Sequence, residues 1–253
     1  MKKIVCLVSF LFLLLSKSYC QNFISEKSET GSFPMVSNDA APIYTDANDG
    51  WLIQNTASLL QDDVEKVTGK KPVIDHTISP SGKNIIIIGS IAQSSFIKQL
   101  IQTKKLKTDS LNGKWEAYQM QIVKNPFKGI DNALVIGGSD KRGTAYGVLE
   151  LSKQIGVSPW YWWADVPVKK KKEIYVSKNI FLQDHPLVKY RGIFINDEAP
   201  AFSGWTREIF GGVNHLVYEK IFELLLRLKA NYLWPAMWGN AFNDDDTLNP
   251  VKN

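Results

Sequence analysis

The 253 residues are enough for one large domain or two smaller ones, and an apolar content of 44% allows a sizeable core. The formal net charge of +5 includes Lys2, Lys3 and Lys17, which lie in an N-terminal segment without acids. Without that segment 27 basic residues face 25 acidic ones, a net charge of +2, which argues against a nucleic-acid partner.

The N-terminal segment, residues 1–20, has the pattern of a signal peptide. Two lysines precede an apolar run of about 12 residues, shorter than the roughly 20 that a membrane span needs. Cleavage after Cys20 predicts an exported protein, periplasmic or extracellular, and no other apolar run predicts a membrane span. Acylation of Cys20 in a lipoprotein is the alternative, which the bulky Tyr19 disfavours. The only other cysteine is Cys6, so the mature chain would have neither a disulfide nor a Cys-ligated zinc site.

A polar leader at 21–33 precedes a region, 34–184, in which strand and helix patterns alternate. This alternation predicts an N-terminal α/β sandwich domain without internal repeats. The expected elements are a strand near 33–38, a helix ending near 68, a strand at 84–90, a helix at 92–103, strands at 115–123 and 132–139, and a helix from 141 to about 156.

Residue spacing and end signals support these elements. Ile53, Ala57, Leu60, Val64 and Val67 step by four and three, which places them on one helical face. We expect Asn48 or Asp49 to cap the start of this helix, Gly69 to end it, and Asp140 to cap the later helix. The run NIIIIGS predicts a central strand that is covered on both faces.

Several conspicuous stretches are interpreted as turns, loops or packing residues rather than as ligand sites. In GGSDKRGT the residue directly after Gly143 is Thr144, where a phosphate-binding loop has lysine, so a tight turn is expected. NDDDTLN lacks the glycine and glutamate of a calcium loop. His76, His185 and His215 are scattered, so no metal site is predicted. The four-lysine run at 169–172 is typical of a solvated turn. The aromatic run at 160–163 predicts a seam between two domains, with a sugar-stacking platform as the alternative.

A second unit begins near 185. HPLVKYRGIFIN predicts a strand and NYLWPAM another, and an amphipathic helix between them has Val217, Ile221, Leu224, Leu225 and Leu228 on one face. Strand, helix and strand form one βαβ unit. A (β/α)8 barrel needs roughly 250 residues, so 185–253 can be the start of an incomplete catalytic barrel or an appendage on the first domain. Two strands alone would leave their apolar faces open to water.

Polar residues follow both strands of this unit. In barrel enzymes the reactive groups lie just past the carboxyl ends of the strands. Asn196, Asp197 and Glu198 follow the first strand, and Trp238 and Asn240 follow the second. Three aspartates at 244–246 lie farther along the same loop. Carboxylates, amides and aromatic faces together are suited to binding a sugar.

Three motifs resemble the opening of glycoside hydrolase family 115, the xylan α-1,2-glucuronidases: GTAYGVLELSKQIGVSPWYWWADVPV, YRGIFINDEAPAFSGW and FELLLRLKANYLWPAMWGNAFNDDD. The resemblance implies an α/β domain before a (β/α)8 barrel. It also implies inverting removal of glucuronic acid, often 4-O-methylated, from the side chains of glucuronoxylan or its oligosaccharides, without a cofactor. A homodimer of the full-length form is left open.

The resemblance places the general acid on a later barrel strand, so this chain is expected to be truncated and inactive alone. Asp197 is then the candidate that binds substrate or positions the water, with Glu198 as the second candidate. The alternative for Glu198 is an ion pair with Arg191 or Arg207. The candidate substrate-binding residues are Asn196, Trp238 and Asn240. Trp238 and Asn240 are the candidates for the pocket wall, with core packing and hydrogen bonding within the loop as the alternatives. The alternative function is a stand-alone secreted carbohydrate-binding or interaction module.

Overall fold

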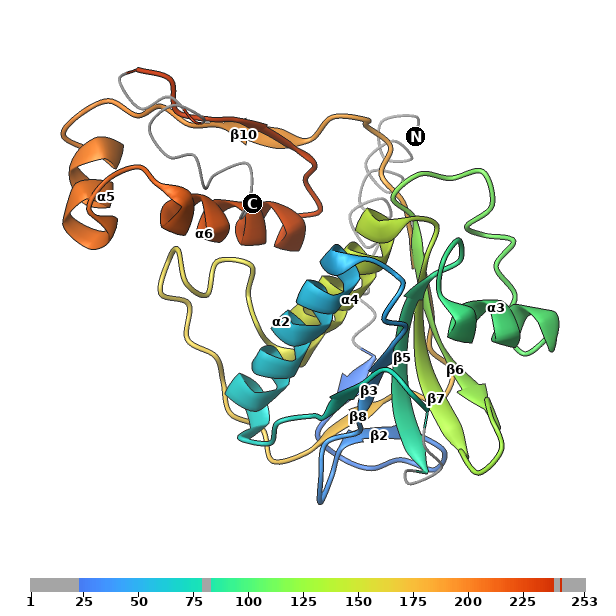
Figure 1. Ribbon diagram of the computed structural model, residues 1–253. Coiled ribbons are helices and arrows are strands. Elements are labelled where there is room, and N and C mark those ends of the chain that lie inside the picture. The colour runs from blue at the N-terminus through green and yellow to red at the C-terminus, as the bar shows by residue number, and fades with distance from the viewer. Residues whose placement is uncertain (1–22, 79–82, 239–241, 243–253) are drawn as a thin grey trace, which may run out of the picture.

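The structure is a computed structural model that describes residues 23–78, 83–238 and 242. Its largest sheet has six strands in the order β4-β3-β5-β7-β6-β9 (Figure 1). The bounds of these strands are β3 (Ile43–Thr45), β4 (Ile74–Asp75), β5 (Asn84–Ser90), β6 (Tyr118–Lys124), β7 (Asn132–Gly138) and β9 (Phe181–Asp184). Strands β4, β3, β5 and β7 are parallel, whereas β6 runs antiparallel to both β7 and β9. The mixed α/β fold expected from the sequence is confirmed.

The central strand β5 is buried on both faces, as its apolar run predicts. Ile86 and Ile88 join the core beneath α2 (Trp51–Thr68) and α4 (Lys141–Ile155). Ile85 and Ile87 join the core beneath α3 (Ser95–Gln102), which covers the opposite face (Figure 1). Successive side chains of a strand point to opposite faces, so one isoleucine run supplies both cores.

A three-stranded sheet with the order β1-β8-β2 completes the core beneath α2 and α4. Its strands are β1 (Ile24–Ser25), β2 (Phe33–Val36) and β8 (Ile174–Val176). The predicted strand near 33–38 is confirmed, but β1, β3, β4, β8 and β9 were not expected because each has only two to four residues. Such short strands carry too little alternation to stand out in a sequence.

The helix ends test the capping predictions. Asp140 accepts a hydrogen bond from the Gly143 N–H at 2.8 Å and caps α4, and Gly69 ends α2 in the left-handed conformation, so both are confirmed. The cap expected at Asn48 or Asp49 is wrong, because α2 starts after Gly50 without a side-chain cap. The Asp49 carboxylate instead accepts hydrogen bonds from the Ser90 N–H and hydroxyl at 2.6 and 2.5 Å. Burial raises the pKa of this carboxyl, and it ties the start of α2 to the end of β5.

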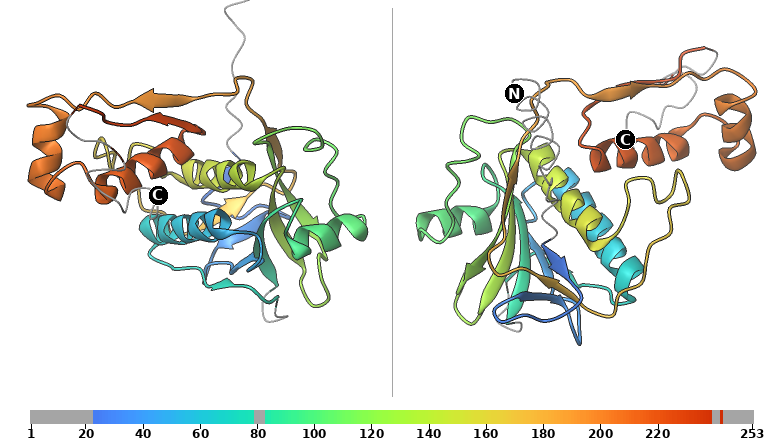
Figure 2. Two further views of the ribbon diagram at one scale, coloured as in Figure 1. Left: turned by 45° about the horizontal axis from the view of Figure 1, so that its top comes forward. Right: turned by 180° about the vertical axis from the view of Figure 1, so that it is seen from behind.

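The second unit forms its own small sheet. Its elements are β10 (Gly192–Phe194), α5 (Phe202–Phe210), α6 (His215–Arg227) and β11 (Tyr232–Trp234). Strands β10 and β11 pair in parallel and do not join the six-stranded sheet (Figures 1 and 2). The βαβ unit is therefore as predicted, with α5 as an unexpected addition. Leu228 was placed on the buried face of α6 but is 40% exposed, because the helix ends before it. The division at 184–185 stays a prediction.

The aromatic run at 160–163 packs against the second unit. The rings of Trp162 and Trp163 lie 6.2 and 5.6 Å from the ring of Trp205 in α5. The indole N–H of Trp163 donates to the Lys220 carbonyl in α6 at 3.2 Å. These contacts favour the interpretation of the run as a seam, although Trp160 stays 45% exposed.

A buried ion pair joins α2 to α6 in the same region. The guanidinium of Arg227 donates to both carboxylate oxygens of Asp63, at 2.8 and 3.1 Å, and to Glu223 at 2.8 Å. Burial disfavours the charge of Arg227, but the neighbouring Asp63 and Glu223 outweigh it and raise its pKa. The side chains of Asp63 and Arg227 are nearly inaccessible to water, so neither can be rehydrated if the other is removed.

Substituting Asp63 by Ala would leave Arg227 buried with only Glu223. We expect the free energy of unfolding, measured by urea denaturation, to fall by about 3 kcal/mol. The control is Asp62→Ala, which breaks an exposed ion pair with Lys71 and is expected to cost less than about 1 kcal/mol. Equal losses in the two variants would contradict the structural role of the buried pair.

Candidate functional site

The carboxyl ends of β10 and β11 bring together two residues singled out from the sequence. Asp197 follows β10 and is 1% exposed, and Trp238 follows β11 and is 66% exposed. The Trp238 N–H donates to the Asp197 carboxylate, 3.0 Å from Oδ2 and 3.3 Å from Oδ1. Parallel strands end at the same edge of a sheet, so the two loops meet there although their residues are 41 positions apart.

The neighbours of Asp197 are placed differently. Asn196 and Glu198 are both exposed, on either side of the buried carboxylate. Glu198 forms no ion pair with another residue of the described chain, and Arg191 pairs with Glu116 instead, so the alternative proposed for Glu198 is wrong. Asn240 and the aspartates at 244–246 lie outside the described residues. Of the five candidate residues, the structure thus joins Asp197 to Trp238 directly.

One face of the β10–β11 sheet is covered by the core around α6, and the other face is partly exposed to solvent. Ile193 and Leu233 pack on the core around α6. Phe194, Tyr232 and Trp234 are about half exposed on the other face, and the Phe194 and Trp234 rings meet edge to face at 5.7 Å. The expectation that both apolar faces would be open is therefore corrected, since α6 covers one of them.

Close approach of the two strands depends on Gly192. A Cβ at this position would lie 1.8 Å from the carbonyl oxygen of Tyr232. No other residue type fits without moving β11, so the pairing that aligns Asp197 with Trp238 requires glycine here.

A buried carboxylate holds the opposite ends of the same strands. Glu116 is 2% exposed and accepts from the Arg191 guanidinium at 2.6 Å and from the Asn231 amide at 2.9 Å. Arg191 directly precedes β10 and Asn231 directly precedes β11. Arg142 at the start of α4 contacts Oε1 of Glu116 at 2.6 Å, the oxygen that also accepts from Asn231 at 2.9 Å. Glu116 therefore fixes the beginnings of both strands to the α/β unit.

Lys229, in the turn between α6 and β11, forms a second polar cluster. Its ammonium lies 2.8 Å from Asp184, 3.0 Å from Glu150 and 2.9 Å from the Tyr118 hydroxyl. Burial opposes the charge on Lys229, Glu150 and Asp184, but their hydrogen bonds and ion pairs outweigh it. They raise the pKa of Lys229 and lower the pKa of Glu150 and Asp184. Burial raises the pKa of Tyr118.

Three charged residues that hold the two units together were not predicted from the sequence: Glu116, Asp63 and Lys229. Each lies far in the sequence from its partners, and single charged residues carry no periodicity. An indirect signal was Arg227, a charge beside the apolar face of an amphipathic helix, which requires a buried partner.

The chemistry available at the strand ends is that of a polar binding site. A buried carboxylate accepts hydrogen bonds, Asn196 supplies an amide, and the exposed Trp238 supplies a flat apolar surface. Within the described residues no three His, Cys, Asp or Glu side chains are grouped as a metal site requires. A helix able to cross a membrane, which would need a long apolar stretch, is likewise absent from the described part.

Comparison with known proteins shows which family and which solved structures this chain is similar to. The sequence model of glycosyl hydrolase family 115 matches residues 183–252, which include β10, α5, α6 and β11. The solved structure of BtGH115A, a family 115 4-O-methyl-α-glucuronidase with specificity for decorated arabinogalactans, is 35% identical, with a TM-score of 0.70 over 81% of this chain. The chain spans 26% of the length of BtGH115A.

Other solved structures are more distant. A chitobiase of Flavobacterium johnsoniae is 15% identical, with a TM-score of 0.45 over 83% of this chain and 25% of its own. A β-hexosaminidase of Streptomyces plicatus is 11% identical, with a TM-score of 0.46 over 80% of this chain and 31% of its own. Among curated proteins none matches the sequence.

Replacing Gly192 by Ala tests the strand pairing. We expect the added methyl group to separate β10 from β11, which would speed amide hydrogen exchange at 192–194 and 232–234 and lower the melting temperature. Gly204→Ala in α5 is the control, because its Cβ meets nothing within 4 Å and alanine favours a helix by up to about 1 kcal/mol. Unchanged exchange in Gly192→Ala would contradict the close approach.

The Lys229 cluster predicts a pH dependence of stability. The pKa values of Glu150 and Asp184 lie below their ordinary values of 4.5 and 3.8, so their stabilisation is present at neutral pH and is lost as the pH falls through the folded-state values. We expect the unfolding free energy to decline below about pH 4.5, and less steeply in Lys229→Met. Lys71→Met, at an exposed ion pair, is the control. Identical acid slopes in Lys229→Met and the unsubstituted protein would refute this origin.

Proposed function

Since this chain belongs to glycoside hydrolase family 115, we propose that it is the N-terminal part of an exported inverting glycosidase that removes glucuronic acid, with or without a 4-O-methyl group, from polysaccharide side chains. Its residues 185–253 then form the first βαβ unit of a catalytic (β/α)8 barrel. The contact between buried Asp197 and Trp238 carries this proposal, because it assembles a polar site where two parallel strands end.

Asp197 has the role of binding the sugar or positioning the attacking water. Its carboxylate is held by the Trp238 N–H, and the exposed indole of Trp238 offers a face for a sugar ring. An inverting glycosidase also needs a second carboxyl group roughly 6.5–9.5 Å from the first. Glu198 is adjacent in sequence but exposed, and we assign it at most an auxiliary role. Asn196 and Asn240 are proposed as further substrate contacts.

The 253 residues alone are proposed to be catalytically inactive. They span 26% of the length of BtGH115A, and two strands do not enclose a barrel pocket. Release of glucuronic acid by the purified chain at ordinary enzyme concentrations would refute this part of the proposal.

The polysaccharide to which the glucuronic acid is attached has two candidates. The motifs resemble xylan-directed enzymes, whereas BtGH115A has specificity for decorated arabinogalactans. Parallel titrations with glucuronic-acid-bearing oligosaccharides from xylan and from arabinogalactan distinguish them. We expect the xylan-derived ligand to bind more tightly, and the reverse order would assign arabinogalactan.

Binding by the Asp197→Asn variant tests the site itself. We expect the loss of a hydrogen bond to a charged group to weaken the binding of a glucuronic-acid-bearing oligosaccharide by about 10- to 100-fold, as measured by calorimetric titration. Glu198→Gln, at the adjacent exposed position, is the matched control and should change affinity less than about twofold. Equal affinities of Asp197→Asn and the unsubstituted chain would exclude Asp197 from the binding site.

A further inference from the structure

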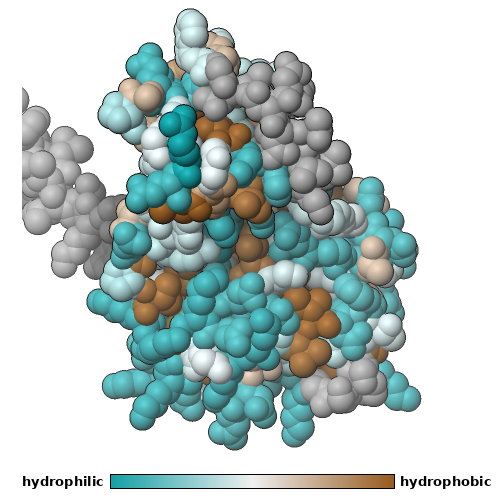
Figure 3. Space-filling model, turned by 60° about the vertical axis from the view of Figure 1, so that its left-hand side comes forward, coloured by the Kyte–Doolittle hydropathy of each residue, from teal (hydrophilic) through white to brown (hydrophobic). Residues whose placement is uncertain are grey.

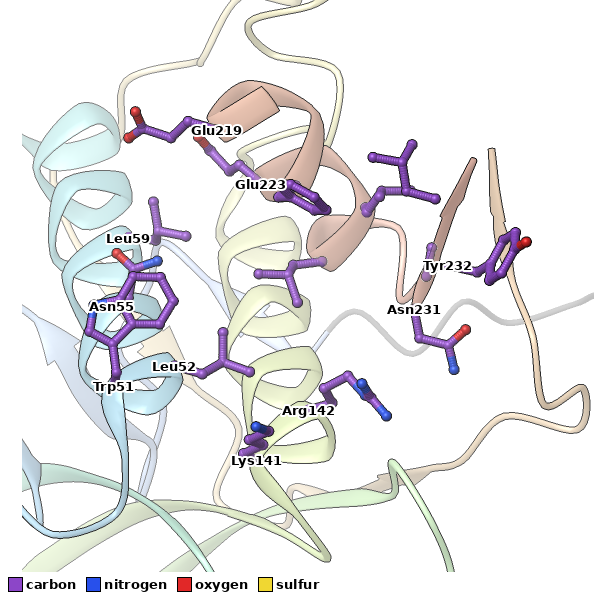
Figure 4. A pocket seen from close by; sticks show the side chains of 15 residues that line it. Trp51, Leu52, Asn55, Leu59, Lys141, Arg142, Glu219, Glu223, Asn231 and Tyr232 are labelled. Carbon is purple, nitrogen blue, oxygen red and sulfur yellow. The ribbon is translucent and has the colours of Figure 1, made fainter. Parts of the chain in front are cut away.

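A cavity lies between the α/β unit and the βαβ unit, away from the carboxyl ends of β10 and β11. Its volume is about 480 Å³, within the range of small-ligand sites. One wall is α2, the other is formed by α6 and β11, and the start of α4 closes one end (Figure 4). In Figure 3 apolar side chains lie among hydrophilic ones where the upper and lower parts of the molecule meet.

Trp51 is the most exposed aromatic side chain of this cavity. It is the first residue of α2 and remains 67% exposed, so its indole contributes little to the core. Trp163 and Trp234, in contrast, use their indole N–H groups in contacts with Lys220 and Met237. Within the described chain the Trp51 N–H has no such acceptor. Trp51 therefore presents both a flat apolar face and an unused donor to the cavity.

Two polar side chains near Trp51, those of Asn55 and Lys141, also have no bonding partner among the described residues. Asn55, one helical turn further along α2, forms no side-chain hydrogen bond with a described residue, and Lys141 at the start of α4 forms no ion pair with one. Arg142 commits its Nε atom to Glu116 and stays about half exposed. Figure 4 places Lys141 and Arg142 at one end of the cavity and Glu219 and Glu223 at the other.

We propose that this cavity is a second carbohydrate-binding site, specific for an acidic oligosaccharide that carries a uronate group. The C–H face of a sugar ring stacks on Trp51, and the uronate carboxylate binds Lys141 and the outer nitrogens of Arg142. Asn55 and Glu219 bind hydroxyl groups, which both donate and accept hydrogen bonds. The site would hold the polysaccharide against the enzyme while another part occupies the strand ends.

The chemistry of the cavity favours a sugar over a helix of another protein. A docked amphipathic helix contributes mainly apolar side chains, which would leave Trp51 N–H, Asn55 and Lys141 without partners and at a cost in desolvation. A uronate-bearing sugar supplies oxygen acceptors to all three. The two cations at one end match a single carboxylate.

The experiment is a titration of the 253-residue protein with a xylo-oligosaccharide that carries one glucuronic acid branch, and with the same oligosaccharide without the branch. We expect two sites for the branched ligand. Trp51→Ala should weaken one of them at least about tenfold, and Lys141→Gln should reduce the preference for the branched ligand. Both side chains are on the surface, and circular dichroism and the melting temperature report whether each variant is folded. Trp160→Ala, an exposed tryptophan outside the cavity, is the matched control.

The inference rests on the proposed carbohydrate substrate, so Asp197→Asn is titrated in parallel. Binding that is lost in Asp197→Asn but unchanged in Trp51→Ala would overturn the second site and leave the proposed function standing. Binding that responds only to Trp51→Ala would support the second site and count against the role of Asp197. Equal affinity for the branched and unbranched ligands, equal effects of Trp51→Ala and Trp160→Ala, or no binding by the unsubstituted protein would each overturn the proposal.

Discussion

The arrangement of this molecule depends on charges that are buried where the βαβ unit meets the α/β unit. Arg227 with Asp63, and Glu116 with Arg191 and Asn231, link segments that are 75 to 164 residues apart in the sequence. Buried charges tolerate little displacement, because separating them leaves each without water and without a partner. A two-stranded sheet has little stability alone. Its position beside α2 and α4 therefore follows from these polar contacts together with the apolar core around α6.

The same constraint positions the candidate site. Glu116 holds the starts of β10 and β11, Gly192 lets the two backbones approach, and parallel pairing carries the alignment to the other ends of the strands. Asp197 and Trp238 meet there. The α/β unit thus contributes no side chain to this contact but fixes the strands that do.

The cavity between the units is a consequence of the same packing. Helix α6 rests on α4 and leaves the start of α2 uncovered, so Trp51 and Asn55 face a hollow rather than a neighbour (Figure 4). The two proposed binding regions use related chemistry, each with an exposed tryptophan beside polar groups. They differ in charge, since Asp197 accepts hydrogen bonds whereas Lys141 and Arg142 attract an anion.

The sequence by itself determined the local elements and the family resemblance. The isoleucine run defined β5, the apolar spacing of α2 and α6 defined their buried faces, and Asp140 and Gly69 defined helix ends, because each signal lies within a few neighbouring residues. Only the tertiary structure decided which charges are buried, that Asp49 binds Ser90 rather than capping α2, that Glu198 stays unpaired with Arg191, and that Trp51 lines a cavity. These outcomes depend on residues far apart in the chain, and the physical reason is that burial and pairing are properties of the packed chain, whereas periodicity is a property of one segment.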